Sequence, residues 1–358
     1  MTNLGELKEA LLYEKLSGKK VQCKLCNHYC LIDDGKTGFC AVRLNEGGKL
    51  YSLSYGKSNG FAVDPIEKKP FYHFRPGTPV LSFGTPGCNF RCRGCQNWDL
   101  SQLPRNSKDP KHVFDSVTTT GPERVAALCL ENDCAGVAYT YSEPTIFFEY
   151  ARDCVKETRK LDAKHYHVFV SNGYFSPQML DLVKKEKLLE AIRIDLKFAD
   201  DALYADYCGA KAGYKVIVEN IKRVFEAGIH CEVINLLVPG LNDDEASVRK
   251  TVKLLAGVSK DVPLHFLKFF PHYRKDDVGA TSDETLLSAR KIAREEGMRF
   301  VYLGNTALEG GGDTSCPKCG NVVVKRSGFG LVENKLVVNA KTREGKCPKC
   351  GEKIYGSW

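Results

Sequence analysis

The chain has 358 residues, of which 43% are hydrophobic and 27% charged, a composition typical of a globular protein with a sizeable core and two or three domains. No apolar run is long enough to span a bilayer, which argues against an integral membrane protein. The formal net charge of +8 suits a polyanionic partner, but metal sites on the cysteines described below would offset part of this positive charge.

The N-terminal region, residues 1–78, is rich in glycine and turns and contains few predicted strands, among them KLYSLSYG. Its opening segment, MTNLGELKEALLYEKL, has the spacing of a charged amphipathic helix. This segment lacks the apolar core of a signal peptide, so we expect a cytoplasmic protein.

The chain contains 16 cysteines, most of them in groups. In a reducing cytosol, grouped cysteines are better explained as metal ligands than as disulfides. The first group has the spacing C-x2-C-x3-C-x9-C, which suits a tetrahedral zinc site or an auxiliary iron–sulfur cluster, with His28 as an alternative ligand. We name this group the N-terminal cysteine set; its members are Cys23, Cys26, Cys30 and Cys40.

Three further cysteines are crowded into SFGTPGCNFRCRGCQNW, which runs from Ser82 to Trp98. Cys88, Cys92 and Cys95 have the spacing C-x3-C-x2-C, directly after an apolar run. Four-iron clusters normally take four thiolates, so three cysteines leave one iron open to another ligand. A zinc site completed by a distant fourth residue is the alternative. The position of the loop after a predicted strand favours the cluster.

Between residues 79 and 304, short apolar strands alternate with amphipathic helices, which predicts a parallel sheet with right-handed crossovers. Such repeats indicate an α/β fold with a partial (β/α) TIM-like barrel. No G-x-G-x-x-G motif follows the first strand, which argues against an open dinucleotide-binding sheet. Strands are expected at 80–84, 136–141, 167–172, 191–196, 231–238, 264–269 and 299–304, and helices at 122–132, 145–161, 178–189, 214–228, 243–257 and 283–297.

Polar residues follow these strands, where a (β/α) barrel places its active site. Glu143 follows the second strand and Asn172 ends the third. Asp195 and Lys197 close the fourth strand, and His272 lies just past the sixth. Together with the three cysteines after the first strand, these residues form the predicted active site.

A glycine-rich segment, NTALEGGGDTS, leads into a compact tail of residues 314–358. Two CPKCG copies there place four cysteines in pairs typical of the two knuckles of a zinc ribbon, joined by a hairpin at VVVKRSGFGLVENKLVV. A rubredoxin-like iron site is the alternative. We name these residues the C-terminal cysteine set; they are Cys316, Cys319, Cys347 and Cys350.

The scattered cysteines are expected to be small buried residues, although Cys208, beyond the fourth strand, is also considered as a catalytic thiol.

The predicted metals weaken the argument from charge. A zinc tetrathiolate carries about −2 and an oxidised four-iron cluster on three thiolates about −1. Two zinc sites and one cluster would lower the formal charge from +8 to about +3, so a nucleic-acid partner is not supported.

GTPGCNFRCRGCQN resembles the cluster loop of the radical S-adenosylmethionine (radical SAM) superfamily. The whole chain resembles the AmmeMemoRadiSam branch of that superfamily, which is related to the pyruvate formate-lyase activating enzyme. The likeness extends over nearly the full length. It includes CKLCNHYCLIDDGKTGFCAVRLN, PIEKKPFYHFRPG, YTYSEPT, IDLKF, VPGLND and the two CPKCG copies.

The resemblance implies a [4Fe–4S] cluster on Cys88, Cys92 and Cys95, whose open iron chelates S-adenosylmethionine. Reductive cleavage then yields a 5′-deoxyadenosyl radical. The resemblance further implies cofactor-binding roles for the residues at the strand ends. Glu143 would receive an ammonium group, Lys197 the methionine carboxylate and Asp195 a monovalent cation, with Asn172 and His272 as additional cofactor contacts.

Two departures from the family pattern stand near these residues. Tyr141 and Ser142 occupy the place of two glycines in the activating enzymes. Gly94 occupies a position that is commonly aromatic and lies against the adenine, a contact that Phe90 or Trp98 would have to replace.

The sequence therefore predicts a radical SAM enzyme that abstracts hydrogen from an unidentified substrate. An activase that installs a glycyl radical on a partner enzyme is one alternative. A zinc-ribbon scaffold protein with a purely structural cluster is another. The expected partners are an electron donor of the flavodoxin or ferredoxin type and, from the names of the family, Memo-like and Ammecr-like proteins.

Overall fold

The computed structural model describes residues 7–358, and these form two compact units. The first unit consists of the residues up to Asp64, Pro79–Glu190 and Ala205–Ala212. The second unit consists of Pro65–Thr78, Ala191–Tyr204 and Gly213–Trp358. The predicted division into three parts, namely an N-terminal region, a barrel and a tail, differs from these two units and stays a prediction.

The first unit contains the N-terminal strands and three parallel strands, β8, β9 and β10, with β9 in the middle. Gly136 of β9 lies opposite both Val80 and Tyr166, and any side chain at this position would collide with the backbone of Tyr166. Its elements are β1 (Lys8–Glu9), β2 (Tyr13–Lys15), η2 (Ser17–Lys19), β3 (Val21–Cys23), β4 (Leu31–Ile32), β5 (Arg43–Glu46), β6 (Lys49–Ser52), β7 (Asn59–Pro65), β8 (Pro79–Gly84), α1 (Trp98–Ser101), α2 (Leu103–Asn106), α3 (Pro110–Asp115), α4 (Pro122–Glu131), β9 (Gly136–Tyr139), η4 (Pro144–Phe147), α5 (Phe148–Leu161), β10 (Tyr166–Ser171) and α6 (Pro177–Glu186).

The predicted N-terminal helix is wrong for the residues that the structure describes; its first six residues lie outside them. Lys8–Glu9 pairs with β6 and Tyr13–Lys15 pairs with β3, both antiparallel. Leu12 between them has a left-handed φ of 54°, which no helix accommodates. Long-range contacts hold the segment extended, because Lys8 forms an ion pair with Asp153 and the backbone of Leu11 donates to Glu149. Tertiary pairing therefore overrides the helical spacing.

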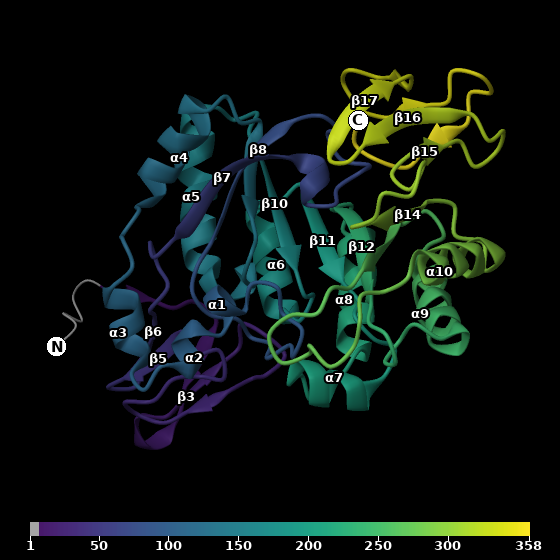
Figure 1. The fold of residues 1–358 in the computed structure, drawn as a ribbon. Helices are drawn as coiled ribbons and strands as arrows, with labels where there is room; N and C mark the ends of the chain where they lie inside the picture. The colour runs from purple at the N-terminus through teal and green to yellow at the C-terminus, as the bar shows by residue number, and fades with distance from the viewer. Residues whose placement is uncertain (1–6) are drawn as a thin grey trace. The chain divides into compact units, whose positions relative to one another are not determined.

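The second unit contains four parallel strands in the order β11, β12, β13, β14. Helices α9 and α10 pack side by side next to these strands (Figure 1). Its elements are η3 (Ile66–Lys68), β11 (Ala191–Asp195), α8 (Lys215–Glu226), β12 (His230–Leu237), α9 (Glu245–Val258), β13 (Leu264–Lys268), α10 (Asp283–Glu295), β14 (Val301–Gly304), β15 (Thr314–Ser315), β16 (Val322–Ser327), β17 (Gly330–Asn334), β18 (Val337–Val338), β19 (Gly345–Lys346) and β20 (Lys353–Ile354), while α7 (Asp201–Cys208) spans the two units.

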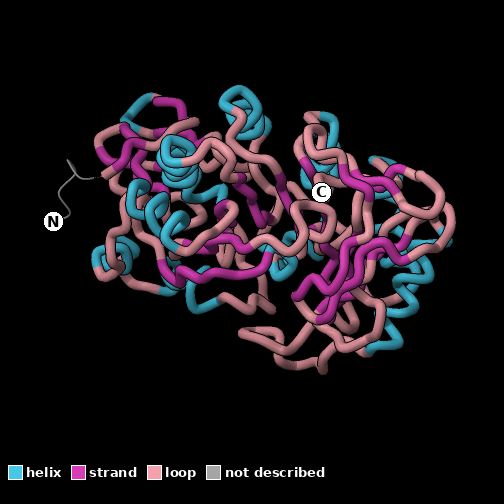
Figure 2. The backbone as a smooth tube through the Cα atoms, turned by 90° about the horizontal axis from the view of Figure 1, so that it is seen from above, coloured by secondary structure: helices cyan, strands magenta, loops and turns pink. Residues whose placement is uncertain are grey.

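Each of the seven strands predicted between residues 79 and 304 is present, as are the six predicted helices. These parallel strands and helices confirm the α/β class with a partial (β/α) barrel. The four short helices α1, α2, α3 and α7 were not predicted. Figure 2 shows that loops, drawn in pink, make up much of the backbone between the elements. Among the described helices, none is long and apolar enough to cross a membrane.

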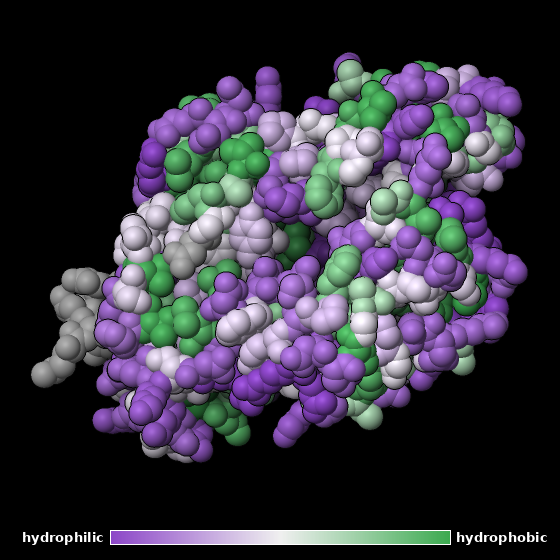
Figure 3. Space-filling view, viewed as in Figure 1, coloured by the Kyte–Doolittle hydropathy of each residue, from purple (hydrophilic) through white to green (hydrophobic). Residues whose placement is uncertain are grey.

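The C-terminal residues form a ribbon of short antiparallel strands, including the predicted hairpin of β16 and β17. The buried side of this ribbon packs in one hydrophobic cluster with Tyr72, Phe300 and Tyr302 of the same unit. The outer side carries exposed apolar side chains, among them Phe329 and Val332. Figure 3 shows hydrophobic and hydrophilic residues mixed over this part of the surface.

Candidate active site and metal centres

The three cysteines of the C-x3-C-x2-C motif lie on the loop between β8 and α1, as predicted. We call residues 85–97 the cluster loop. Cys88, Cys92 and Cys95 are each half-buried. The Cys88 sulfur accepts a hydrogen bond from the backbone N–H of Phe90 at 3.3 Å, and the Cys95 sulfur lies 3.3 Å from the Ser101 hydroxyl. Burial and the nearby Glu143 carboxylate raise the pKa of the Cys88 thiol, so metal binding at Cys88 must displace a proton.

The Arg105 side chain and backbone hydrogen bonds fix the path of the cluster loop. The Arg105 guanidinium donates to the carbonyl groups of Cys88 at 3.0 Å and Phe90 at 3.2 Å. The backbone N–H groups of Arg91 and Arg93 donate to the end of α7 at 2.7 and 3.1 Å. The loop is thus held by groups outside itself. Its three thiols are soft donors on a fixed backbone, and this arrangement fits an iron–sulfur cluster.

Glu143 occupies a buried position at the carboxyl ends of β9 and β10. Its carboxylate accepts hydrogen bonds from the Thr145 backbone at 3.1 Å and hydroxyl at 2.5 Å, from the Ser171 hydroxyl at 2.8 Å and from the Asn172 backbone at 2.7 Å. Burial raises the pKa of Glu143, and these donors oppose the rise. Three of the bonds fall on Oε1 and one on Oε2, so Oε2 keeps room for a further donor.

The Asn172 side chain connects this carboxylate to the cluster loop. Its amide donates to the side-chain oxygen of Asn89, at 2.7 Å, and Asn89 directly follows Cys88. The structure therefore brings Glu143, Asn172 and the cluster loop together within the first unit, as the sequence predicted. The contributions of Ser171 and Asn89 could not be predicted, because their contacts join segments far apart in the chain. The Thr145 contact is local, since Thr145 lies two residues after Glu143 at the start of η4.

Tyr141 and Ser142 form the turn after β9, at the place where the activating enzymes are expected to have two glycines. Tyr141 adopts a left-handed φ of 62°, a conformation that glycine takes easily and a tyrosine takes only when its surroundings hold it. Its hydroxyl donates to Asp64 and its carbonyl accepts from Asn97. The neighbouring Ser142 hydroxyl donates to the Thr85 carbonyl at 2.6 Å. The turn is kept by side-chain contacts instead of glycine.

The two candidates for the missing aromatic contact differ in exposure. Phe90 is buried and its ring packs edge-on against Tyr174, with centroids 5.2 Å apart. Trp98 at the start of α1 is 43% exposed. Phe90 therefore supports the cluster loop from beneath, and Trp98 is the aromatic side chain with a surface open to a ligand.

In the second unit, Asp195 at the end of β11 lies between two cations. Its carboxylate contacts Arg193 at 2.9 Å and Lys197 at 2.8 Å. Burial alone would raise the pKa of Asp195, but these positive charges lower it below its ordinary value. Arg193 was not predicted, although its position two residues before Asp195 puts both side chains on one face of the strand.

The backbone after β11 is held by two asparagines of the same unit. Asn235 of β12 and Asn242, in the VPGLND motif, both donate to the Lys197 carbonyl, at 3.1 and 2.8 Å. They orient the segment that carries Lys197. His272 lies in a turn after β13, where its backbone pairs with Lys275, and its side chain is half-buried.

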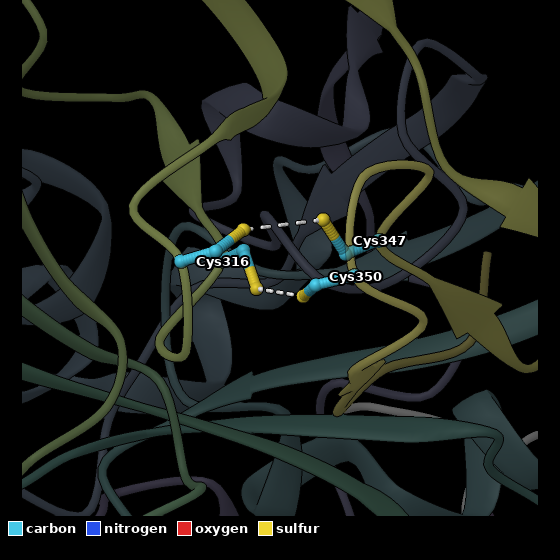
Figure 4. Close-up of side chains that lie close together, drawn as sticks. Cys316, Cys347 and Cys350 are labelled. Atoms are coloured by element: carbon cyan, nitrogen blue, oxygen red, sulfur yellow. Dashed lines mark hydrogen bonds between the residues drawn. The ribbon is translucent and has the colours of Figure 1, made fainter.

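The C-terminal cysteine set forms a compact metal site (Figure 4). Its four sulfur atoms all lie within 4.8 Å of one another, with Cys316 and Cys350 at 3.6 Å and Cys319 and Cys347 at 3.7 Å. Sulfurs about 2.3 Å from a tetrahedral zinc lie roughly 3.8 Å apart. In each knuckle a glycine after the second cysteine has a φ of 71° and donates its N–H back to the first cysteine. This geometry is consistent with a zinc ribbon.

The N-terminal cysteine set lines a small cavity in the first unit, together with His28, Phe39, Arg43 and Asn89. Cys23 is buried and the other three are half-buried. All four cysteines thus line one cavity, and their role as metal ligands stays a prediction. Cys208 is buried, which agrees with a small core residue.

Known proteins support the assignment that these sites suggest. A model of the radical SAM superfamily matches residues 83–255. The uncharacterized protein MJ0808 of Methanocaldococcus jannaschii is 37% identical over 349 residues, which are 97% of this chain and 99% of that protein. The chain belongs to the radical SAM superfamily. A [4Fe–4S] cluster and S-adenosylmethionine are the cofactors that membership in this superfamily implies.

Two solved structures are also similar to this radical SAM protein. A domain of the pyruvate-formate lyase-activating enzyme from Bacteroides vulgatus is 22% identical, covers 48% of this chain and 99% of its own, and has a TM-score of 0.41. A radical SAM methyltransferase from Sphaerobacter thermophilus is 15% identical, and the match covers 63% of this chain and 67% of that protein with a TM-score of 0.46. The family model alone supports the superfamily, and the AmmeMemoRadiSam branch stays a prediction.

Proposed function

We propose that this radical SAM enzyme cleaves S-adenosylmethionine reductively and uses the resulting radical to abstract hydrogen from a substrate. The observation that carries the proposal is the cluster loop, with three half-buried cysteines spaced C-x3-C-x2-C after β8. A bound [4Fe–4S] cluster with one open iron supplies the electron that breaks the sulfonium C–S bond. The remaining steps of binding and orientation fall to the protein.

Within the first unit, Glu143 is the residue we assign to the ammonium group of S-adenosylmethionine. Its carboxylate keeps a free position on Oε2, and a charge-assisted hydrogen bond there would be strong because the site is buried. Asn172 contacts both Glu143 and Asn89, so its role is to hold the carboxylate in register with the cluster loop.

Within the second unit, we assign Lys197 to the methionine carboxylate. Its ammonium group is paired with Asp195, so the ligand would share or replace that partner. Asp195 keeps its negative charge through Arg193 and Lys197, which supports a role in holding cations. His272 is assigned as an additional cofactor contact from its place after β13. We also propose that the C-terminal cysteine set binds zinc and that the enzyme works in the cytoplasm with a flavodoxin- or ferredoxin-type donor.

The direct test is the formation of 5′-deoxyadenosine. Anaerobically reconstituted protein with S-adenosylmethionine and a strong reductant should form 5′-deoxyadenosine, and Cys92→Ala should abolish it, because the cluster would lose one of three ligands. Chromatography of the product measures both.

Cys134→Ala is the matched control, since Cys134 is a buried cysteine outside the three metal-ligand groups. If Cys92→Ala retains both cluster absorbance and turnover, the assignment of the ligands is wrong. A fully loaded cluster that forms no 5′-deoxyadenosine would instead support the scaffold function. A substrate can then be sought by comparing metabolites, proteins and RNA with and without the active enzyme.

A further inference from the structure

The cavity of the N-terminal cysteine set lies directly behind the cluster loop, within the same unit. Asn89 of the cluster loop lines it, and Asn89 follows the ligand Cys88 in the chain. Further bonds join the two regions: the Arg105 guanidinium donates to both the Phe39 carbonyl and the Cys88 carbonyl. The cavity is therefore a separate cysteine-lined site that shares a wall with the cluster loop.

The spacing of the cysteines distinguishes this site from the C-terminal one. Within residues 7–358, no three ligand atoms from the N-terminal cysteine set and His28 lie within 4.8 Å of one another, whereas all four sulfurs of the C-terminal cysteine set do. A single zinc draws its thiolates to roughly 3.8 Å from each other. The thiolates of a four-iron cluster bind separate irons and lie further apart. Among the described residues, the N-terminal cysteine set therefore does not show the spacing that a single zinc ion requires.

Unsatisfied donors in the cavity wall give a second, independent observation. Arg43 Nε and Asn89 Nδ2 are buried without a hydrogen-bond partner, and both side chains are about 1% exposed. The other nitrogens of Arg43 bind Glu149 at 2.7 and 2.8 Å, so the guanidinium cannot turn away. The Phe39 backbone N–H already points to the Cys30 sulfur at 3.5 Å. Sulfur atoms of a cluster would satisfy such donors, and hydrogen bonds to these atoms tune the potential of a cluster.

His28 is not a ligand through Nε2, because that nitrogen lies 2.7 Å from the Asn89 carbonyl and must donate to it. Its ring is stacked on Phe39, with centroids 4.2 Å apart. The side chain is thus fixed as part of the wall between the two sites. The four thiols of the N-terminal cysteine set then remain as the ligands.

We propose that the N-terminal cysteine set binds a second [4Fe–4S] cluster with all four irons ligated by the protein. This cluster has no open iron, so it does not chelate S-adenosylmethionine. Its presence is independent of the function assigned to the cluster loop. The second cluster would add a redox centre next to the cluster loop, with Asn89 and His28 between the two sites.

The test removes the first cluster and asks whether iron remains. The triple variant Cys88→Ala, Cys92→Ala, Cys95→Ala, reconstituted anaerobically with iron and sulfide, should retain about four iron and four sulfide per chain. It should also contain about one zinc per chain, from the ribbon. Iron, acid-labile sulfide and zinc are measured, and the reduced protein is examined by electron paramagnetic resonance. About two zinc with no iron would overturn the proposal.

A second measurement covers the case in which the triple variant does not fold. The reconstituted unaltered protein should contain about eight iron per chain, and Cys26→Ser should contain about half as much. Unchanged iron together with the loss of one zinc would assign the site to zinc and overturn the proposal. Absence of 5′-deoxyadenosine from protein that contains eight iron would reject the proposed function and leave the second cluster standing.

Discussion

At the scale of single residues, Glu143 combines two tasks, because its carboxylate both joins β9 to β10 and offers a free position for a ligand. Glu143→Gln should weaken S-adenosylmethionine binding by about ten- to a hundredfold, since it removes a charged hydrogen bond of roughly 1.5–3 kcal/mol. Titration of the reduced cluster, followed by electron paramagnetic resonance, measures the affinity.

The matched control is Ser171→Ala, which removes one donor to Glu143 but keeps the charge. It should change the affinity by less than about threefold, as expected for one neutral hydrogen bond. The cluster spectrum should be intact in both variants. Unchanged affinity in Glu143→Gln would reduce the role of Glu143 to holding η4 and Asn172 in place.

At the scale of elements, a buried network joins β12, β13, β14 and the segment Pro65–Thr78. Glu232 of β12 binds His265 at 2.7 Å and the backbone of His73 at 2.8 Å. The His73 ring is bound to Tyr302 and, at 2.5 Å, to the Tyr355 carbonyl. Burial lowers the pKa of His73 to about 3, so this ring stays neutral in the folded state at pH values where the unfolded chain is protonated.

The sign of the pH effect follows. Below about pH 6.5 the unfolded state binds a proton that folded His73 refuses, so stability should fall by about 1.4 kcal/mol per pH unit from this group. His73→Gln should be less stable near neutral pH because its hydrogen bonds are lost, but its deficit in unfolding free energy should narrow by roughly 2 kcal/mol as the pH falls from 6.5 to 4.5. Urea unfolding of the unaltered protein and of His73→Gln at several pH values measures this difference in unfolding free energy. A deficit that is constant with pH contradicts the neutral, buried state of His73.

The elements also show what can be inferred from sequence. The parallel strands were predictable, because their apolar runs and the helices between them reflect burial on both faces. The four-cysteine site of the C-terminal cysteine set was predictable from cysteine spacing. The N-terminal segment was not, because its extended path depends on Asp153 and Glu149, far away in the chain. Ser171 and Arg43 were missed for the same reason, because their partners Glu143 and Glu149 are distant in the chain. Arg193 was missed although its partner Asp195 is only two residues away.

At the scale of the whole molecule, the three cysteine groups are divided between the two compact units. The cluster loop and the N-terminal cysteine set belong to the first unit, and the C-terminal cysteine set belongs to the second. Cys350→Ser should therefore remove about one zinc per chain and leave the iron content unchanged. It should also lower the unfolding temperature, because Cys347 and Cys316 share a hydrophobic cluster with Tyr302. Elemental analysis and thermal unfolding measure both effects, and a parallel loss of iron contradicts the separation.

Gly87 on the cluster loop has a consequence for how this fold can be divided. Its φ is 104°, and a Cβ atom there would lie 2.4 Å from the Val42 side chain and 3.4 Å from the Cys40 carbonyl. The loop thus rests on the N-terminal region with no room for a side chain between them. A fragment beginning at Pro79 would keep β8 to β14, but it would lose β7, the neighbour of β8 in the sheet, and the residues on which the cluster loop packs. Recombination with other barrels, in the laboratory or in evolution, has to carry residues 7–64 along.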